Sequence, residues 1–192
     1  MRNSRHWKYP VRYPLCQFCP KRQDLVDSLV PYFKAGLNNN ERCLWITAPP
    51  FPANEAEAEL GKVVPDLEVM IKEGRIRIFE AKEWFASTGG MGGNDLIAFW
   101  LDEEEKALAG GYRGLRIAGN TSFVTPEHWD TFMDYESAVN AAFQGRRIVS
   151  LCSYNLHQCR ATGILEVVRN HEYTLDRRDL NWDVLHKTLD PA

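Results

Sequence analysis

Residues 43–64 read CLWITAPPFPANEAEAELGKVV and contain an apolar run, a proline-rich turn and an acidic segment, in that order. The run CLWITA (43–48) combines aromatic and β-branched residues, which is typical of a buried strand. The segment 53–64 carries acidic residues early, where the helix dipole favours negative charge, and this pattern predicts a helix. The stretch is therefore a strand followed closely by a helix, the unit from which parallel α/β sheets are built.

The same alternation of strand and helix continues along the chain. Apolar residues three and four positions apart mark the inner faces of helices, as in QDLVDSLVPYFKAGL (23–37). Because short strands alternate with helices, we expect right-handed crossovers and a mostly parallel sheet with helices on both faces. The predicted helices are 23–37, 53–64, 66–74, 95–111, 126–143 and 161–171, and the predicted strands are 43–48, 75–81, 115–119, 147–154 and an edge strand 172–178.

The composition is that of an ordinary soluble globular protein, with 44% hydrophobic and 26% charged residues in a chain of 192. The formal net charge of −3 gives no general attraction to nucleic acid or to anionic membranes, so we expect direct binding to neither. The N-terminus lacks the apolar core of a secretory signal. Five cysteines are few and odd in number, which disfavours a disulfide scaffold and predicts a cytoplasmic location.

A nucleotide site requires glycines and a Lys-Ser/Thr pair between a strand and the next helix. After the strand 43–48 the chain reads PPFPANEAE, which has two acidic residues and no glycine. The glycine-rich stretch GGMGG (89–93) lacks a lysine and does not directly follow a strand, so we interpret it as part of a flexible loop over the strand ends. The motifs G-x-S-x-G and HExxH are absent. The sequence therefore disfavours ATP hydrolysis, and no catalytic residue is predicted.

Polar residues fall at the carboxyl ends of the predicted strands, where open α/β sheets bind their ligands. Glu136 lies in phase with the apolar stripe of its helix, and a buried carboxylate must be paired, protonated or in contact with a ligand. Arg116 is the candidate partner, either in an internal ion pair or in a shared site, and His171 is either a helix cap or a ligand contact. A Cys152–His171–Glu136 nucleophilic arrangement has no signature in the spacing. The predicted ligand-binding residues are Trp45, Trp84, Phe85, Arg116, Asn120, Glu136, Cys152, Tyr154 and His171.

The cysteines offer an alternative to an organic ligand. Cys16-x-x-Cys19 has the spacing of half a zinc site, and His157 and Cys159 are candidates for the other half, although their spacing is irregular. Cys16 and Cys19 also fit a thiol redox pair, and Cys19-Pro20 matches a short element of some haem-responsive proteins. We expect no cofactor from the organic-ligand interpretation, and zinc or haem from the alternative.

The order of six segments resembles that of the MEDS family, which comprises sensory domains named for methanogens, methylotrophs and a dichloromethane-responsive regulator. The segments are QDLVDSLVPYFKAGLNNNERCLWITA, VPDLEVMIKEGRIRIF, EEKALAGGYRGLRIAGNTSF, MDYESAVNAAF, RIVSLCSY and ILEVVRNHEY. The resemblance implies a three-layer RecA/KaiC-like fold without a functional Walker A loop. The resemblance covers 14–178, which we take as the sensory domain. The preceding residues 1–13 are rich in Tyr, Arg and Pro and indicate an irregular N-terminal arm, and the segment 179–192 is interpreted as a tail or linker helix.

The resemblance also implies functional residues. The family's Cys-x-Phe, Tyr-Glu, Cys-x-Tyr and late His elements match, in turn, Cys16 and Phe18, Tyr135 and Glu136, Cys152 and Tyr154, and His171. The chain departs from the family at Pro14 and Cys19, where members typically carry a His and a Tyr.

We therefore expect a non-enzymatic cytoplasmic sensory domain that binds a small organic molecule, a hydrocarbon derivative, at the strand ends. The resemblance implies an effector, either a DNA-binding regulator or a histidine kinase, which would respond to a population shift in the loop 82–94 and the chain ends. One alternative is the thiol-redox or metal sensor. The other is an interaction module that docks a partner, or a second copy to form a homodimer, through a sheet edge or the helix 95–111.

Overall fold

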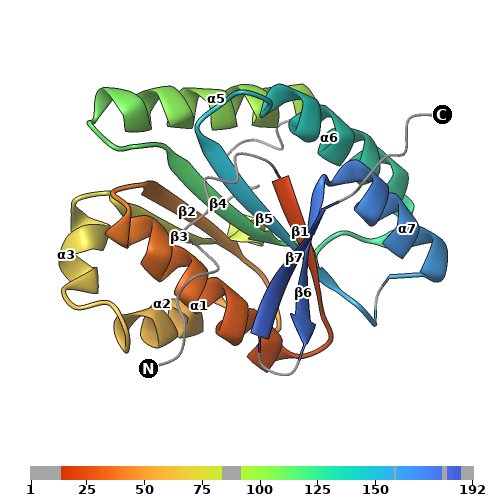
Figure 1. Ribbon diagram of the computed structural model, residues 1–192, viewed down its shortest axis with the longest axis horizontal. Coiled ribbons are helices and arrows are strands. Elements are labelled where there is room, and N and C mark those ends of the chain that lie inside the picture. The colour runs from red at the N-terminus through yellow and green to blue at the C-terminus, as the bar shows by residue number, and fades with distance from the viewer. Residues whose placement is uncertain (1–13, 84–91, 158, 179–180, 187–192) are drawn as a thin grey trace.

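The computed structural model describes residues 14–83, 92–157, 159–178 and 181–186, which form one seven-stranded sheet flanked by helices (Figure 1). The strand order is β3-β2-β4-β5-β1-β6-β7. The strands are β1 (Pro14–Cys19), β2 (Arg42–Thr47), β3 (Ile76–Glu80), β4 (Leu115–Asn120), β5 (Ile148–Asn155), β6 (Tyr173–Arg178) and β7 (Asn181–His186). The helices are α1 (Arg22–Asn38), α2 (Ala53–Gly61), α3 (Leu67–Lys72), α5 (Gly93–Ala109), the short 3₁₀ helix η2 (Pro126–His128), α6 (Trp129–Ala142) and α7 (Ala161–Asn170).

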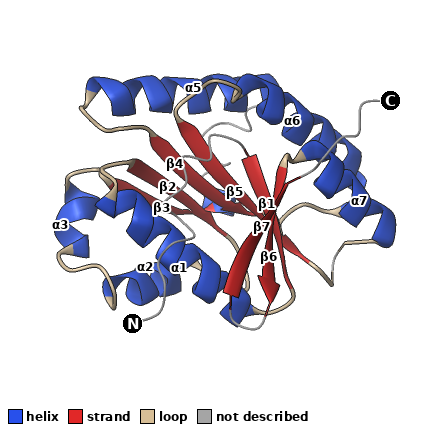
Figure 2. Cartoon of the chain, viewed as in Figure 1, coloured by secondary structure: helices blue, strands red, loops and turns tan. Residues whose placement is uncertain are grey.

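The sheet is parallel except at one edge. Strand β1 pairs in parallel with β5 and with β6, whereas β6 and β7 are antiparallel. Helices cover both faces, with α1 and α2 on one side and α5, α6 and α7 on the other (Figure 2). The predicted three-layer, mostly parallel α/β fold is thereby confirmed.

The two ends of the chain differ from the sequence prediction. Residues 14–19 form β1, a central strand that the prediction omits. The segment 172–178 is an interior strand and not an edge strand, because β6 pairs with β1 on one side and with β7 on the other. Residues 181–186 form β7, and the prediction of a terminal or linker helix is wrong there, because this segment instead pairs with β6 as an antiparallel hairpin. The predicted arm, 1–13, lies outside the described residues.

The turn between β1 and α1 excludes a phosphate-binding loop of the Walker A type. Only Pro20 and Lys21 connect the first strand to the first helix, whereas that loop needs about eight residues with two glycines. The sequence shows no phosphate-binding loop after β2, and the structure shows none after β1 either. No helix among the described residues is long and apolar enough to cross a membrane.

Candidate functional site: a pocket beside a buried polar cluster

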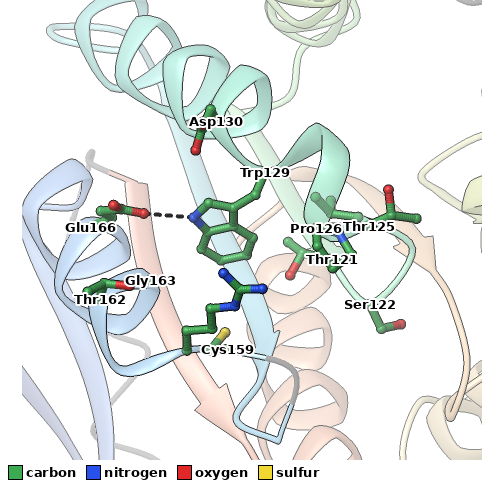
Figure 3. A pocket seen from close by; sticks show the side chains of 12 residues that line it. Thr121, Ser122, Thr125, Pro126, Trp129, Asp130, Cys159, Thr162, Gly163 and Glu166 are labelled. Carbon is green, nitrogen blue, oxygen red and sulfur yellow. Dashed lines mark hydrogen bonds between the residues drawn. The ribbon is translucent and has the colours of Figure 1, made fainter.

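A pocket of about 600 Å³ opens at the carboxyl ends of β4 and β5 (Figure 3). Three segments form its walls: the loop after β4, the start of η2 and α6, and the first turns of α7. Its lining combines hydroxyl groups, charged groups and apolar surface, from Thr121, Ser122, Val124, Thr125, Pro126, Trp129, Asp130, Cys159, Arg160, Thr162, Gly163 and Glu166. The position agrees with the general rule that open α/β sheets bind ligands at the strand ends.

Trp129 is the largest side chain of the pocket, and α7 holds it in place. Its indole Nε1 donates a hydrogen bond to Glu166 Oε2 at 2.7 Å, as Figure 3 shows. A Cβ atom at Gly163 would lie 3.0 Å from Trp129 Cζ2, so the backbone of α7 approaches the ring closely at this glycine. The first turns of α6 and α7 are thus joined through one aromatic side chain.

Trp129 also contacts a buried cluster that does not line the pocket. Its ring meets that of Tyr154 edge to face, with centroids 6.3 Å apart, and Tyr154 in turn meets His171 at 6.1 Å. Tyr154 and His171 are each 1% exposed. The pocket and the cluster are therefore neighbours separated by two aromatic rings.

The centre of this cluster is a contact between a histidine, a carboxylate and a thiol. His171 Nε2 lies 3.1 Å from Glu136 Oε2, and Cys152 Sγ lies 3.7 Å from Glu136 Oε1. The other ring nitrogen of His171, Nδ1, lies 2.9 Å from the carbonyl oxygen of Val167, to which it donates. Strand pairing places Cys16 directly beside Cys152 on the neighbouring strand β1.

Burial suppresses ionisation of the groups around Glu136. It raises the pKa of the Cys16 thiol to about 12, and it raises the pKa values of Cys152 and Tyr154 well above their ordinary ranges, with the charge of Glu136 adding to the effect. Both thiols are therefore protonated at neutral pH. Glu136 lies between Cys152 and His171, whereas a nucleophilic triad needs the histidine between the nucleophile and the acid. The arrangement lacks the geometry of a cysteine nucleophile.

The predicted pair between Arg116 and Glu136 is wrong. Arg116 Nε donates to Glu41 Oε2 at 2.5 Å, and its guanidinium lies over the ring of Tyr32 at 4.5 Å. Successive side chains of a strand point to opposite faces, and Arg116 points to the α1 face while α6 covers the other. The sheet itself thus separates Arg116 from Glu136.

The other predicted ligand-binding residues that the structure describes do not join the cluster around Glu136. Trp45 is 1% exposed and stacks on Phe33 at 4.6 Å in the core under α1. Asn120 lies at the end of β4, next to the pocket, where its side-chain amide donates to the carbonyl oxygens of Ala48 at 2.8 Å and Pro49 at 3.3 Å. Trp84 and Phe85 lie outside the described residues.

The predicted cysteine–histidine metal site is not assembled. Cys16 and Cys19 are three positions apart on β1, so their side chains point to opposite faces: Cys16 packs with Tyr154, and Cys19 packs with the core under α1. His157 is exposed, and Cys159 lines the pocket. The same separation excludes a Cys16–Cys19 redox pair.

Among the pocket residues, only Cys159 belongs to the predicted site residues, and it is predicted as a metal ligand and not as part of an organic-ligand pocket. Thr125 and Pro126 indicate a helix start just after a strand end, which places the first turn of that helix at the mouth of the sheet. Trp129 belongs to the same apolar stripe as Glu136 and therefore suggests core packing. The contribution of α7 has no comparable signal, because nothing in the sequence states that α7 packs beside α6.

Comparison with solved structures places this architecture in the RecA-like class. The flagellar accessory protein FlaH from Methanocaldococcus jannaschii matches with a TM-score of 0.54 and 10% identity, over 92% of this chain and 77% of FlaH. A KaiC-like protein from Pyrococcus horikoshii OT3 matches with a TM-score of 0.55 and 10% identity, over 93% of this chain and 79% of that protein. At such identities the likeness concerns the fold alone.

Within that class, the chain belongs to the MEDS family, the MEthanogen/methylotroph, DcmR Sensory domain, whose family model matches residues 15–172. The transcriptional repressor DcmR from Methylorubrum extorquens is 29% identical over 152 residues, which are 76% of this chain and 52% of the repressor. The chain thus spans about half the length of this curated relative. The family predicted from the sequence is confirmed, and with it a regulatory, sensory role.

Proposed function

We propose that this domain is non-enzymatic and senses a small organic molecule, a hydrocarbon derivative, in the pocket between α6 and α7. The observation that carries the proposal is the pocket itself, which lies at the ligand-binding edge of a sheet whose first turn has no room for a phosphate loop. Family membership supports sensing as its purpose.

The lining of the pocket suits a small molecule with one apolar and one polar end. Trp129, Val124 and Pro126 supply apolar surface, while hydroxyl groups such as that of Thr121 lie at the strand end. Pockets of this kind bind through apolar contact and gain specificity from a few placed polar groups.

Binding would be transmitted through the two helices that form the walls. A ligand changes a conformational equilibrium only through different affinities for the two states. A ligand beside Trp129 changes the surroundings of the bond between Trp129 and Glu166, which ties α6 to α7. We infer an effector, a DNA-binding domain or a kinase, that responds to the relative position of these helices, in line with the similarity to a repressor of which the matched region covers 52%.

The experiment is a thermal-unfolding screen of small alcohols, organic acids and halocarbons against the purified chain. A ligand that binds only the folded state raises the melting temperature, and the rise grows with the logarithm of the ligand concentration above the dissociation constant. We expect at least one compound class to do so in the wild type and not in a Thr162→Phe variant, whose added ring would occupy the pocket from α7.

The matched control is Leu165→Phe on the same helix. Leu165 is 57% exposed and does not line the pocket, so this variant should respond to ligand like the wild type. The proposal fails if no compound shifts the melting temperature of the wild type. It also fails if Thr162→Phe and Leu165→Phe retain the same shift.

A further inference from the structure

The contact between His171 and Glu136 requires a cation between the two side chains. Nδ1 of His171 donates to the carbonyl oxygen of Val167, so its hydrogen is already used. In the neutral imidazole the facing Nε2 then carries a lone pair, and it lies 3.1 Å from a carboxylate oxygen that also carries lone pairs. Two acceptors at this distance repel each other unless a proton or a metal ion lies between them.

Two buried polar atoms of the cluster have unused bonding capacity. His171 Nε2 and the Tyr154 hydroxyl are buried and make no hydrogen bond of normal geometry. Buried polar atoms are nearly always bonded, and exceptions often mark a missing ion or water molecule. Both atoms belong to side chains that are 1% exposed, so bulk solvent does not satisfy them.

The donor set is one that zinc prefers. Glu136, Cys152 and His171 each offer one ligand atom, and these three atoms lie within 4.8 Å of one another. Around a tetrahedral zinc ion, the ligand atoms O and N are about 3.3 Å apart and O and S about 3.5 Å apart, given bond lengths near 2.0 Å for O and N and 2.3 Å for S. His171 Nε2 lies 3.1 Å from one oxygen of the Glu136 carboxylate and Cys152 Sγ lies 3.7 Å from the other, so the nitrogen and the sulfur both lie near a tetrahedral spacing from this group.

The bond from His171 to Val167 matches the support that metal-binding histidines usually have. Such a histidine donates its second ring N–H to a carbonyl or carboxylate, which fixes the tautomer and orients the ligand nitrogen. The carbonyl of Val167 lies one helical turn before His171, at the end of α7, so the helix itself aims Nε2 at Glu136.

From this geometry we propose that Glu136, Cys152 and His171 bind one zinc ion. Metal binding displaces the proton of the Cys152 thiol to solvent. The resulting carboxylate, thiolate and neutral imidazole together carry two negative charges, which a divalent cation cancels, and a buried site needs such neutrality. Three protein ligands leave a fourth position for water or another small ligand. The proposal does not depend on the occupant of the pocket.

The test uses the full purified chain, stripped of metal and titrated with Co²⁺, which reports its ligands spectroscopically. We expect one equivalent to bind and to produce the near-ultraviolet absorption of a cobalt–thiolate bond, and one equivalent of Zn²⁺ to abolish that absorption. Cys152→Ser should lose the band, whereas Cys159→Ser, which changes a half-buried thiol lining the pocket, should retain it.

The wild-type titration decides the matter even if the variants fold poorly. Absence of the thiolate band at equimolar cobalt, together with no zinc retained after dialysis, would overturn the proposal and leave a proton as the bridging cation. A band that persists in Cys152→Ser and disappears in Cys159→Ser would assign the metal to the pocket thiol and also overturn it. A pocket ligand that binds with or without zinc would leave the sensory proposal standing.

Discussion

Both faces of the sheet bury charged side chains, and Arg116 on one face and Glu136 on the other are satisfied differently. Under α1, Arg116 is 3% exposed, is paired with Glu41 and lies over the ring of Tyr32. Under α6, Glu136 is 4% exposed and faces His171 and Cys152, beside the Tyr154 hydroxyl, which makes no hydrogen bond of normal geometry. Arg116 finds its partners within the protein, whereas the cluster around Glu136 keeps polar atoms that can still bind an ion or a proton.

The difference suggests a division of labour within the fold. The α1 face carries stacked aromatic rings, Phe33 on Trp45, and no group there lines the pocket. The α6 and α7 face carries both the pocket and the polar cluster. We interpret the α1 face as the structural half of the domain and the α6 and α7 face as the half that responds.

The largest effect is expected from Arg116→Ala. The change leaves the Glu41 carboxylate without its partner, removes the cation–π contact and opens a cavity, so the free energy of unfolding should fall by about 3–5 kcal/mol. Denaturant unfolding measures the loss. Lys62→Ala, which breaks an exposed pair with Glu59, should change stability by about 0.5 kcal/mol or less. Similar losses in both variants would contradict a structural role for the α1 face.

A smaller effect is expected from Gly36→Ala, which tests how tightly the same face is packed. The new Cβ would lie 2.5 Å from Arg116 Cδ and 3.0 Å from Cys43 Sγ, and both side chains are buried. Overpacking of this kind costs about 1–3 kcal/mol. Gly119→Ala is the matched control in β4, because nothing lies within 4 Å of its added Cβ. A Gly36→Ala variant as stable as Gly119→Ala would show that Arg116 can move.

How far the sequence predicts this molecule depends on the element. The central strands and helices follow from local patterns, since CLWITA has the composition of a buried strand and 95–111 has the period of a helix. Strand β1 escapes because PLCQFC, buried at nearly every position, lacks both the alternation of a half-buried strand and the β-branched residues of a core strand. Strand β7 is not predicted, because its strand conformation depends on pairing with β6 and not on a pattern within its own residues.

Some features of the candidate site can be predicted from the sequence and others cannot. The phase of Glu136 in its helix predicts its burial, and the side chain is 4% exposed. Its partner is not predictable from phase, because β4 offers Arg116 to one face and Ile117 to the other, and only the packing of α6 decides which face meets Glu136. The convergence of Cys152 and His171 likewise depends on where α7 is placed after β5.

The smallest effect is expected from the buried thiols, one on each face. Burial raises the pKa values of Cys43, under α1, and of Cys16, near Glu136, to about 12 from an ordinary value of 9.0. Since the folded pKa is the higher one, the unfolded chain ionises first. The stability that the protonated thiols contribute is complete below pH 9 and is lost as the pH rises toward 12.

Each thiol should therefore lower the free energy of unfolding by about 1 kcal/mol between roughly pH 8 and pH 10. Urea unfolding of Cys43→Ala and Cys16→Ala at both pH values isolates the two contributions, because each variant should lose about half of the alkaline sensitivity that the pair supplies. If the faces differ as argued, Cys43 and Cys16 will contribute equally to the pH dependence of stability in metal-free protein. Added zinc will then change only the contribution of Cys16, which lies near Glu136. A zinc effect on the Cys43 contribution would mean that the two faces are coupled through the sheet, and the division between them would have to be abandoned.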